Sequence, residues 1–197
     1  MKSEIRVLGI DDGTFTPHSK DPVLIVGVVF RGGNWLEGIM HTTIRVDEFD
    51  ATEKLAEMIT NSPHYNQLRV VMLNGITFAG FNIVDIKALN AKTNLPVIAV
   101  TDKKPDLNKI HNALENLPNS EERWNAILNA GEIYPVTAQS GKQKIYIEIA
   151  NISKDVAQEV LRLTSSRSNI PEALRAAHVI ASGAVLNNLS ISSANNA

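Results

Sequence analysis

The chain has 197 residues, a formal net charge of −2 and 44% hydrophobic residues, which suits one domain with a mostly aliphatic core. It contains no cysteine, and this excludes disulfides, thiolate zinc sites, iron–sulfur clusters and a cysteine nucleophile. The near-neutral charge supplies no global positive field, so a nucleic-acid partner would have to meet a local basic patch or bound metal ions. The N-terminus is too charged for a signal peptide, and no apolar run approaches the roughly 20 residues that span a bilayer. We therefore expect a cytoplasmic protein that does not enter the membrane.

The first part of the chain predicts three antiparallel strands. Residues from Glu4 to Asp12 alternate between apolar and polar before becoming apolar, and Val23 to Phe30 form a continuous apolar run. Arg31 to Asn34 contains two glycines and predicts a hairpin turn. Trp35 to Val46 alternates loosely and completes the meander.

After this point the spacing of apolar residues alternates between helical and strand-like. The expected elements are a helix from an N-cap at Asp50 to Asn61, a strand over Leu68–Leu73, a helix over Phe81–Leu89, a strand over Pro96–Val100, helices over Leu107–Leu117 and Glu122–Ala130, a strand over Gln143–Ile149, a helix from Ser153 to Leu163, and a helix from Pro171 towards Leu186. We expect residues 1–189 to form a single domain and the polar residues 190–197 to form a flexible tail.

This order of elements predicts an α/β fold with a five-stranded mixed sheet and helices on both faces. The expected strand order is 3-2-1-4-5, in which the first three strands are antiparallel and the last two run parallel to the first. The ribonuclease H core has the same order.

Five short stretches resemble endonuclease V and occur in the same order as in that family. They are Gly9-Ile10-Asp11-Asp12, Asp50 at a helix start, the apolar strand from Val70 to Gly75, Leu95 to Val100, and Ile170 to His178. The segments Asn74–Asn82 and His178–Gly183 are more similar to a largely archaeal family of unknown function (domain-of-unknown-function family ninety-nine), which is grouped with endonuclease V. The resemblance spans about residues 5 to 182 and implies a ribonuclease H-like fold and a divalent-metal-dependent nuclease.

A metal-dependent phosphodiesterase needs hard oxygen ligands for Mg²⁺ or Mn²⁺, which activate water and stabilise the leaving oxygen. The resemblance and the strand-end positions together give Asp11, Asp12, Asp50 and Asn74 as candidate metal ligands. Asp11 and Asp50 are also candidate catalytic residues. His178 is the third candidate catalytic residue, and it could act as a further metal ligand or as a proton shuttle. We expect Asp11, Asp50, Asn74 and His178 to line one cleft at the carboxyl end of the first strand.

Candidate substrate-binding residues are Asn74, Gly75 and Lys103. Lys103 follows the strand that ends at Val100, one position out of register with a lysine of endonuclease V. Gly75 follows the strand that ends at Asn74, and the two residues are equally explained as a turn dipeptide.

Each acidic or basic candidate also has a purely structural interpretation. Asp11 and Asp12 precede a glycine and suit a turn. Asp50 suits an N-cap. His178 lies on an apolar helical face, where a buried histidine with a hydrogen-bond partner is common.

Two departures from endonuclease V leave the function open. Asn74 is neutral where that family has an aspartate, which should weaken metal binding. The aromatic wedge segment of endonuclease V is replaced by His41 to Val46, so recognition of deaminated bases does not transfer by that route. One hypothesis is therefore a metal-dependent endonuclease or phosphodiesterase acting on nucleic acid. The other is a non-catalytic nucleic-acid- or ligand-binding protein that kept the fold and lost full metal competence. Small-molecule phosphate chemistry would fit the same site, and the sequence does not predict the oligomeric state.

Overall fold

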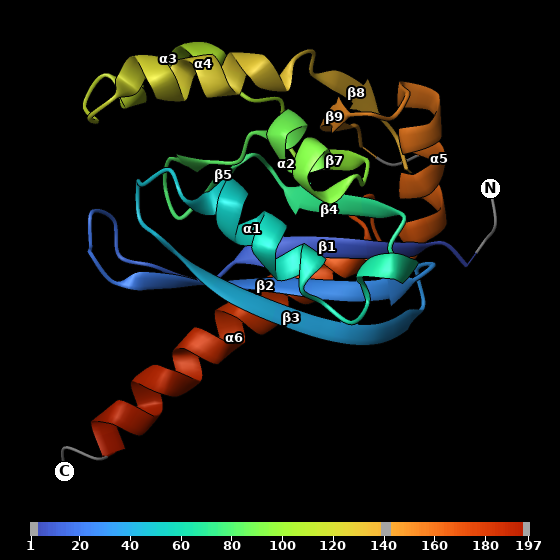
Figure 1. Ribbon diagram of the computed structural model, residues 1–197, viewed down its shortest axis with the longest axis horizontal. Helices are drawn as coiled ribbons and strands as arrows, with labels where there is room; N and C mark the ends of the chain where they lie inside the picture. The colour runs from blue at the N-terminus through green and yellow to red at the C-terminus, as the bar shows by residue number, and fades with distance from the viewer. Residues whose placement is uncertain (1–3, 139–142, 195–197) are drawn as a thin grey trace.

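The computed structural model describes residues 4–138 and 143–194, with side chains as far as residue 184. Its centre is a seven-stranded mixed sheet (Figure 1). In sheet order the strands are β3 (Trp35–Arg45), β2 (Pro22–Arg31), β1 (Arg6–Asp12), β4 (Val70–Asn74), β7 (Val97–Thr101), β9 (Ile145–Ala150) and β8 (Tyr134–Val136).

The expected order of the first five strands is confirmed, because β3, β2 and β1 are antiparallel while β4 and β7 run parallel to β1. The expected number of strands was too low. Strand β9 pairs antiparallel with β7, and β8 pairs antiparallel with β9. Strand β8 has three residues, one of them Pro135, and is too short to show a period in the sequence.

Helices cover both faces of the sheet, as expected (Figure 1). One face carries α1 (Ala51–Thr60), α2 (Ile86–Thr93), α3 (Leu107–Leu114) and α4 (Ser120–Ala130), and the other carries α5 (Lys154–Thr164) and α6 (Glu172–Ala194). A single 3₁₀ turn, Tyr65–Gln67, precedes β4. Each face has its own cluster of buried aliphatic side chains, with Leu8 and Ile10 of β1 on the α1 side and Val7 on the α6 side. Burial on both faces explains why the central strands are almost continuously apolar.

The expected helix over residues 81–89 is wrong in its first half. A small hairpin of β5 (Thr77–Phe78) and β6 (Asn82–Ile83) occupies this segment, with Ala79 and Gly80 at positive φ in the turn. Helix α2 begins only after Asp85, whose carboxylate accepts the backbone N–H groups of Lys87 and Ala88. The apolar residues of the hairpin are spaced as in a helix, so periodicity alone misplaced the boundary.

A buried arginine ties α4 to this hairpin. Arg123 is 1% exposed, and its guanidinium donates to the backbone oxygens of Pro118, Asp47, Glu48 and Phe81. Its acceptors therefore come from the loop between β3 and α1, from the turn of the β5–β6 hairpin, and from the chain just before α4.

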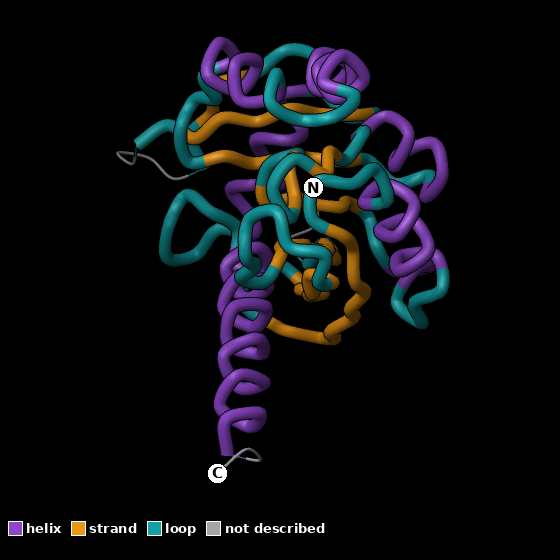
Figure 2. The backbone as a smooth tube through the Cα atoms, turned by 90° about the vertical axis from the view of Figure 1, so that its left-hand side faces the viewer, coloured by secondary structure: helices purple, strands orange, loops and turns teal. Residues whose placement is uncertain are grey.

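Helix α6 is longer than expected. It continues to Ala194 instead of ending near Leu186, so the expected tail from residue 190 is helical in its first part, and residues 195–197 lie outside the described residues. The polar residues here are Ser and Asn, which weaken a helix by less than about 1 kcal/mol each and do not break it as proline would. The distal part of α6 extends away from the sheet (Figure 2). Within the part of the chain that the structure describes, no helix is long and apolar enough to cross a membrane.

Candidate active site at the carboxyl end of the central strand

Asp11 lies near the end of β1, in the middle of the sheet, and is only 2% exposed. Its Oδ1 accepts the backbone N–H of Asp12 at 2.9 Å. Its Oδ2 accepts the side-chain amide of Asn74 at 3.0 Å and lies 2.8 Å from Nδ1 of His178. Asn74 and His178 therefore both contact Asp11, and these are three of the four residues that the sequence placed in one cleft.

The sheet brings Asn74 to Asp11. Strands β1 and β4 are parallel, with Ile10 opposite Leu73, so the residues that follow them lie side by side at the same sheet edge. Ligand sites of open α/β sheets are usually found outside the carboxyl ends of their strands.

Helix α6 brings His178 to the same place because it packs very closely against β1. A Cβ at Gly9 would overlap the backbone of Ala173 and Leu174, so only glycine permits this approach. His178 is one to two turns further along the helix, on the side that faces the end of β1.

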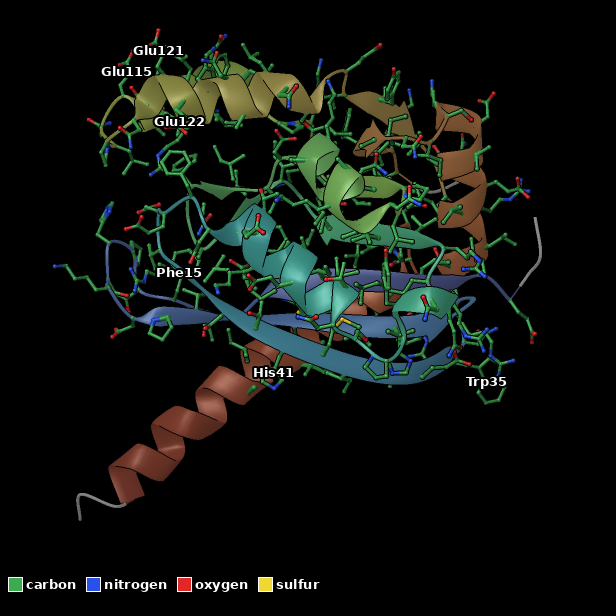
Figure 3. The ribbon with its side chains drawn as sticks, in the orientation of Figure 1. Phe15, Trp35, His41, Glu115, Glu121 and Glu122 are labelled. Carbon is green, nitrogen blue, oxygen red and sulfur yellow. The ribbon has the colours of Figure 1, made fainter. Side chains whose placement is uncertain are left out.

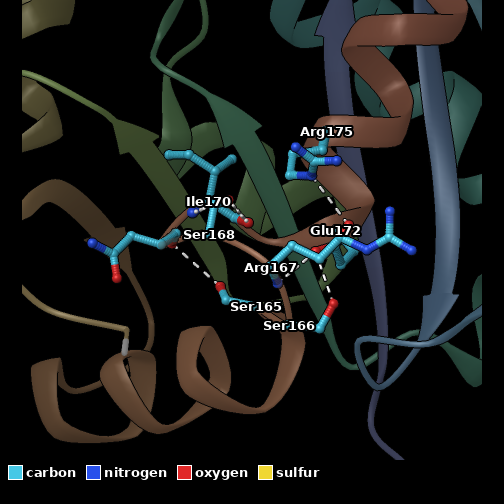
Figure 4. Close-up of polar contacts among 8 residues, drawn as sticks. Ser165, Ser166, Arg167, Ser168, Ile170, Glu172 and Arg175 are labelled. Atoms are coloured by element: carbon cyan, nitrogen blue, oxygen red, sulfur yellow. Dashed lines mark hydrogen bonds and ion pairs between the residues drawn. The ribbon is translucent and has the colours of Figure 1, made fainter. Parts of the chain in front are cut away.

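The start of α6 is held in place by its own first residue. The Glu172 carboxylate accepts the hydroxyl of Ser166 at 2.8 Å, the backbone N–H of Arg167 at 3.1 Å and Nε of Arg175 at 3.1 Å (Figure 4). These hydrogen bonds and the contact at Gly9 fix the direction of α6 and, with it, the position of His178.

The two aspartates at this strand end are costly to ionise. Burial raises the pKa of Asp11, against the opposing effect of its hydrogen bonds. Burial, together with the nearby charge of Asp11, raises the pKa of Asp12 to about 6. Within the described residues, Asp11 has only His178 as an ionic partner, and Asp12 has no Lys or Arg partner. A cation at this position would offset the cost of ionisation.

Asp12 points to the opposite face from Asp11, as successive residues of a strand do. Its Oδ2 accepts the backbone N–H of Ala79, in the β5–β6 turn, at 2.6 Å. This contact holds the β5–β6 hairpin against β1.

Asp50 is engaged elsewhere. Its Oδ1 accepts the amide of Asn82 at 2.6 Å and the backbone N–H of Arg45 at 3.4 Å, and no contact joins it to Asp11 in the described chain. Nor does its side chain cap α1. The side-chain oxygen of Asn82 accepts the N–H of Ala51 instead. Of the four residues expected to line one cleft, the structure therefore joins Asp11, Asn74 and His178 and leaves Asp50 aside.

Gly75 and Lys103 lie on the other side of the β4 strand end from the Asp11 cluster. They line a cavity of about 290 Å³ between the ends of β4 and β7 and helices α3 and α4. The same cavity contains Glu148 of β9, which is 5% exposed and whose pKa burial raises to about 7.

Glu148 and Asn82 are the two residues of interest that sequence reasoning missed. Asn82 sits in a segment assigned to a helix, which hid its role as a buried cap. Glu148 belongs to a strand in which charged and aromatic residues alternate with isoleucines, a pattern typical of a strand with one solvated face. Helices α3 and α4 close that face, and their placement is not visible in the local sequence.

The family model described as endonuclease dU matches residues 3–185. The chain belongs to the endonuclease dU family. Among its relatives, a UPF0215 protein of Methanothermobacter thermautotrophicus is 52% identical over 187 residues, which cover 94% of this chain and 90% of that protein. A UPF0215 protein of Pyrococcus furiosus is 42% identical over 185 residues, which cover 92% of this chain and 93% of that protein.

Solved structures agree with the fold of this endonuclease dU family member. A protein of unknown function from Archaeoglobus fulgidus superposes with a TM-score of 0.81 at 35% identity, covering 90% of this chain and 96% of that one. Human endonuclease V gives a TM-score of 0.60 at 17% identity, with 95% of this chain and 87% of that chain covered. Ciona intestinalis endonuclease V, in complex with DNA that contains an inosine, gives 0.61 at 12% identity, with 94% and 87% covered. The chain thus has the endonuclease V fold.

Proposed function

We propose that this protein is a divalent-metal-dependent endonuclease that cleaves DNA at or beside a deoxyuridine. The observation that carries the proposal is the contact of Asp11 with both Asn74 and His178 at the end of the central strand. The family description adds the deoxyuridine and the nuclease activity. The wedge segment of endonuclease V is missing, so base recognition has to come from another part of this chain.

The residues around Asp11 fit one Mg²⁺ or Mn²⁺ ion. The carboxylate of Asp11 and the amide oxygen of Asn74 are hard ligands of the kind these ions prefer. The buried Asp11 and half-buried Asp12 carboxylates, without a Lys or Arg partner in the described chain, provide the negative charge that favours such an ion. We propose one ion and not two, because Asp50 has other partners and no three His, Asp or Glu side chains in the described ranges are grouped to hold a metal. When bound, the ion would polarise the scissile phosphate and lower the pKa of water.

His178 is proposed as the group that moves a proton. With Nδ1 donating its proton to Oδ2 of Asp11, Nε2 is left to accept a proton from the attacking water or to return one to the leaving oxygen. The side chain is 65% exposed, so a phosphate can approach it from solvent. Asp11 fixes the ring and stabilises the imidazolium when it forms.

A non-catalytic binding module is the second candidate function. The neutral Asn74 and the lack of a three-ligand group in the described residues favour it. Such a protein would bind uracil-containing DNA without cleaving it.

The test is cleavage of a labelled oligonucleotide that carries one deoxyuridine, single- or double-stranded, against the same oligonucleotide with thymidine. The nuclease predicts cleavage of the deoxyuridine strand in Mn²⁺ or Mg²⁺, its loss in EDTA, and its loss in Asp11→Asn. The matched control is Asp155→Asn, which changes an exposed aspartate at the start of α5 and should retain activity. Binding without cleavage by the wild-type protein in either metal would favour the binding module.

A further inference from the structure

The cavity beside Gly75 has the properties of a binding pocket for one planar ring. Its volume of about 290 Å³ is close to the lower limit of roughly 300 Å³ for small-molecule sites. Its walls include Ile76, Leu107, Ile110 and Ile127. It adjoins Asn74 through Gly75, so a group held here is adjacent along the chain to the Asp11 cluster.

One acidic group is buried in this apolar pocket. Glu148 is 5% exposed, and its carboxyl makes no hydrogen bond or ion pair with any other residue of the described chain. A buried carboxyl without a partner costs free energy, so such a group commonly serves a ligand. The charged residues that line the same cavity, Lys103 and Lys104, are exposed, while α3 and α4 contribute only apolar side chains to it.

We propose that Glu148 selects against cytosine by pairing with an unstacked base whose ring nitrogen carries a hydrogen, as in uracil. Apolar walls would hold the faces of the ring, and the carboxyl would meet its polar edge. Lys103 and Lys104, outside the pocket, are placed to contact the backbone phosphates.

Both protonation states of Glu148 suit uracil. The ionised carboxylate accepts the N3–H group, and the neutral carboxyl also donates to the neighbouring carbonyl. Cytosine has a lone pair at N3, so it pairs with the neutral carboxyl and is repelled by the carboxylate. Discrimination of uracil against cytosine should therefore increase as Glu148 ionises, and burial raises the pKa of this group to about 7.

This inference rests on the proposed function only for the choice of DNA as ligand. Binding is measured in EDTA, without the metal that cleavage needs, so base selection is tested separately from the nuclease activity. The experiment measures dissociation constants by fluorescence anisotropy, at pH 6.0 and 8.5, for single-stranded oligonucleotides with one central deoxyuridine, deoxycytidine or N3-methyldeoxyuridine. The proteins are the wild type, Glu148→Gln, Glu148→Ala and the control Glu121→Gln, which changes an exposed glutamate of α4.

The wild type and Glu121→Gln should prefer deoxyuridine over both other bases by roughly tenfold, and the preference over deoxycytidine should increase with pH. In Glu148→Gln the neutral amide can pair with either base, so this preference should fall towards one at both pH values. Glu148→Ala should lose both preferences.

The inference would be overturned if the wild-type preference for deoxyuridine over deoxycytidine did not depend on pH. It would also be overturned if that preference persisted in Glu148→Gln. These outcomes are independent of catalysis. Cleavage at deoxyuridine by a Glu148→Ala protein with unchanged base preference would leave the nuclease intact and remove Glu148. Base-selective binding that requires Glu148, without cleavage by the wild type, would keep the role of Glu148 and contradict the proposed nuclease.

Discussion

Nδ1 of His178 lies 2.8 Å from Oδ2 of Asp11, although 167 positions separate the two residues in the chain. The contact forms only when the last helix packs across the first strand. The candidate site is therefore completed by the end of the chain, and changes that move α6 should affect activity before they affect the sheet.

His178→Ala should reduce the cleavage rate by about 10²- to 10⁴-fold, the usual contribution of a positioned proton-transfer group. The side chain is 65% exposed, so thermal stability should change little. Single-turnover cleavage and thermal melting measure the two effects. The control is His41→Ala on the exposed surface of β3, which should cleave at the wild-type rate (Figure 3). A rate within twofold of wild type would remove His178 from the mechanism.

Asn74→Asp should tighten Mn²⁺ binding and destabilise the metal-free protein. The new carboxylate adds a ligand charge, and without metal it faces Oδ2 of Asp11 in place of an amide donor at 3.0 Å. The lost hydrogen bond to a charged group costs roughly 1.5–3 kcal/mol. Calorimetric titration and melting with and without Mn²⁺ check both effects. Equal melting temperatures for variant and wild type in both conditions would contradict this role.

Glu148→Gln should stabilise the protein above neutral pH. The wild-type carboxyl has a folded-state pKa of about 7, above its unfolded value, so the folded protein loses stability as the pH rises from about 4.5 through 7. Glutamine does not ionise. The difference in free energy of unfolding, variant minus wild type, should therefore increase between pH 5 and pH 8 by up to about 3 kcal/mol. Urea unfolding at the two pH values measures it, and a constant difference would show that Glu148 is not buried in solution.

Gly9→Ala should displace α6, because the new methyl group meets the backbone of Ala173 and Leu174, which cannot rotate away. Overpacking of this kind typically costs 1–3 kcal/mol. Activity should fall with stability, since His178 moves with the helix. Gly131→Ala is a control for loss of a glycine: its Cβ meets nothing within 4 Å, although its positive φ carries a conformational cost. Wild-type activity in Gly9→Ala would show that the close approach is not needed.

Phe15 is an exposed aromatic residue at the same end of the molecule as Asp11, in the loop that follows β1, whereas Trp35 lies at the opposite end (Figure 3). A base can stack on such a ring, which is typically worth 1–3 kcal/mol. Phe15→Ala should therefore weaken binding of single-stranded DNA by about tenfold, and Trp35→Ala should not. The reverse order of affinities would place the nucleic acid at the other end of the sheet.

The sequence predicted most of the fold because the order of strands and helices can be inferred from the local pattern of apolar residues, and β1, β2, β4 and β7 stand out as short apolar runs. Motifs that resemble endonuclease V placed Asp11, Asp50, Asn74 and His178 at one strand end, and the structure brings Asn74 and His178 to Asp11. It did not predict that Asp50 would be bound by Asn82, because that contact depends on a hairpin whose residues have helical spacing. Burial of Glu148 was not predictable from its strand, since the cover comes from α3 and α4, two separate helices earlier in the chain.

Arg123 has a consequence for how the molecule opens. Its buried guanidinium is bonded to four backbone oxygens from three separate segments, and no acidic side chain of the described chain forms an ion pair with it. Detaching any one segment would leave a charge or a carbonyl without its partner inside the protein. Helix α4, the β5–β6 turn and the loop before α1 should consequently unfold together as one cooperative unit, and this unit includes a wall of the Glu148 cavity.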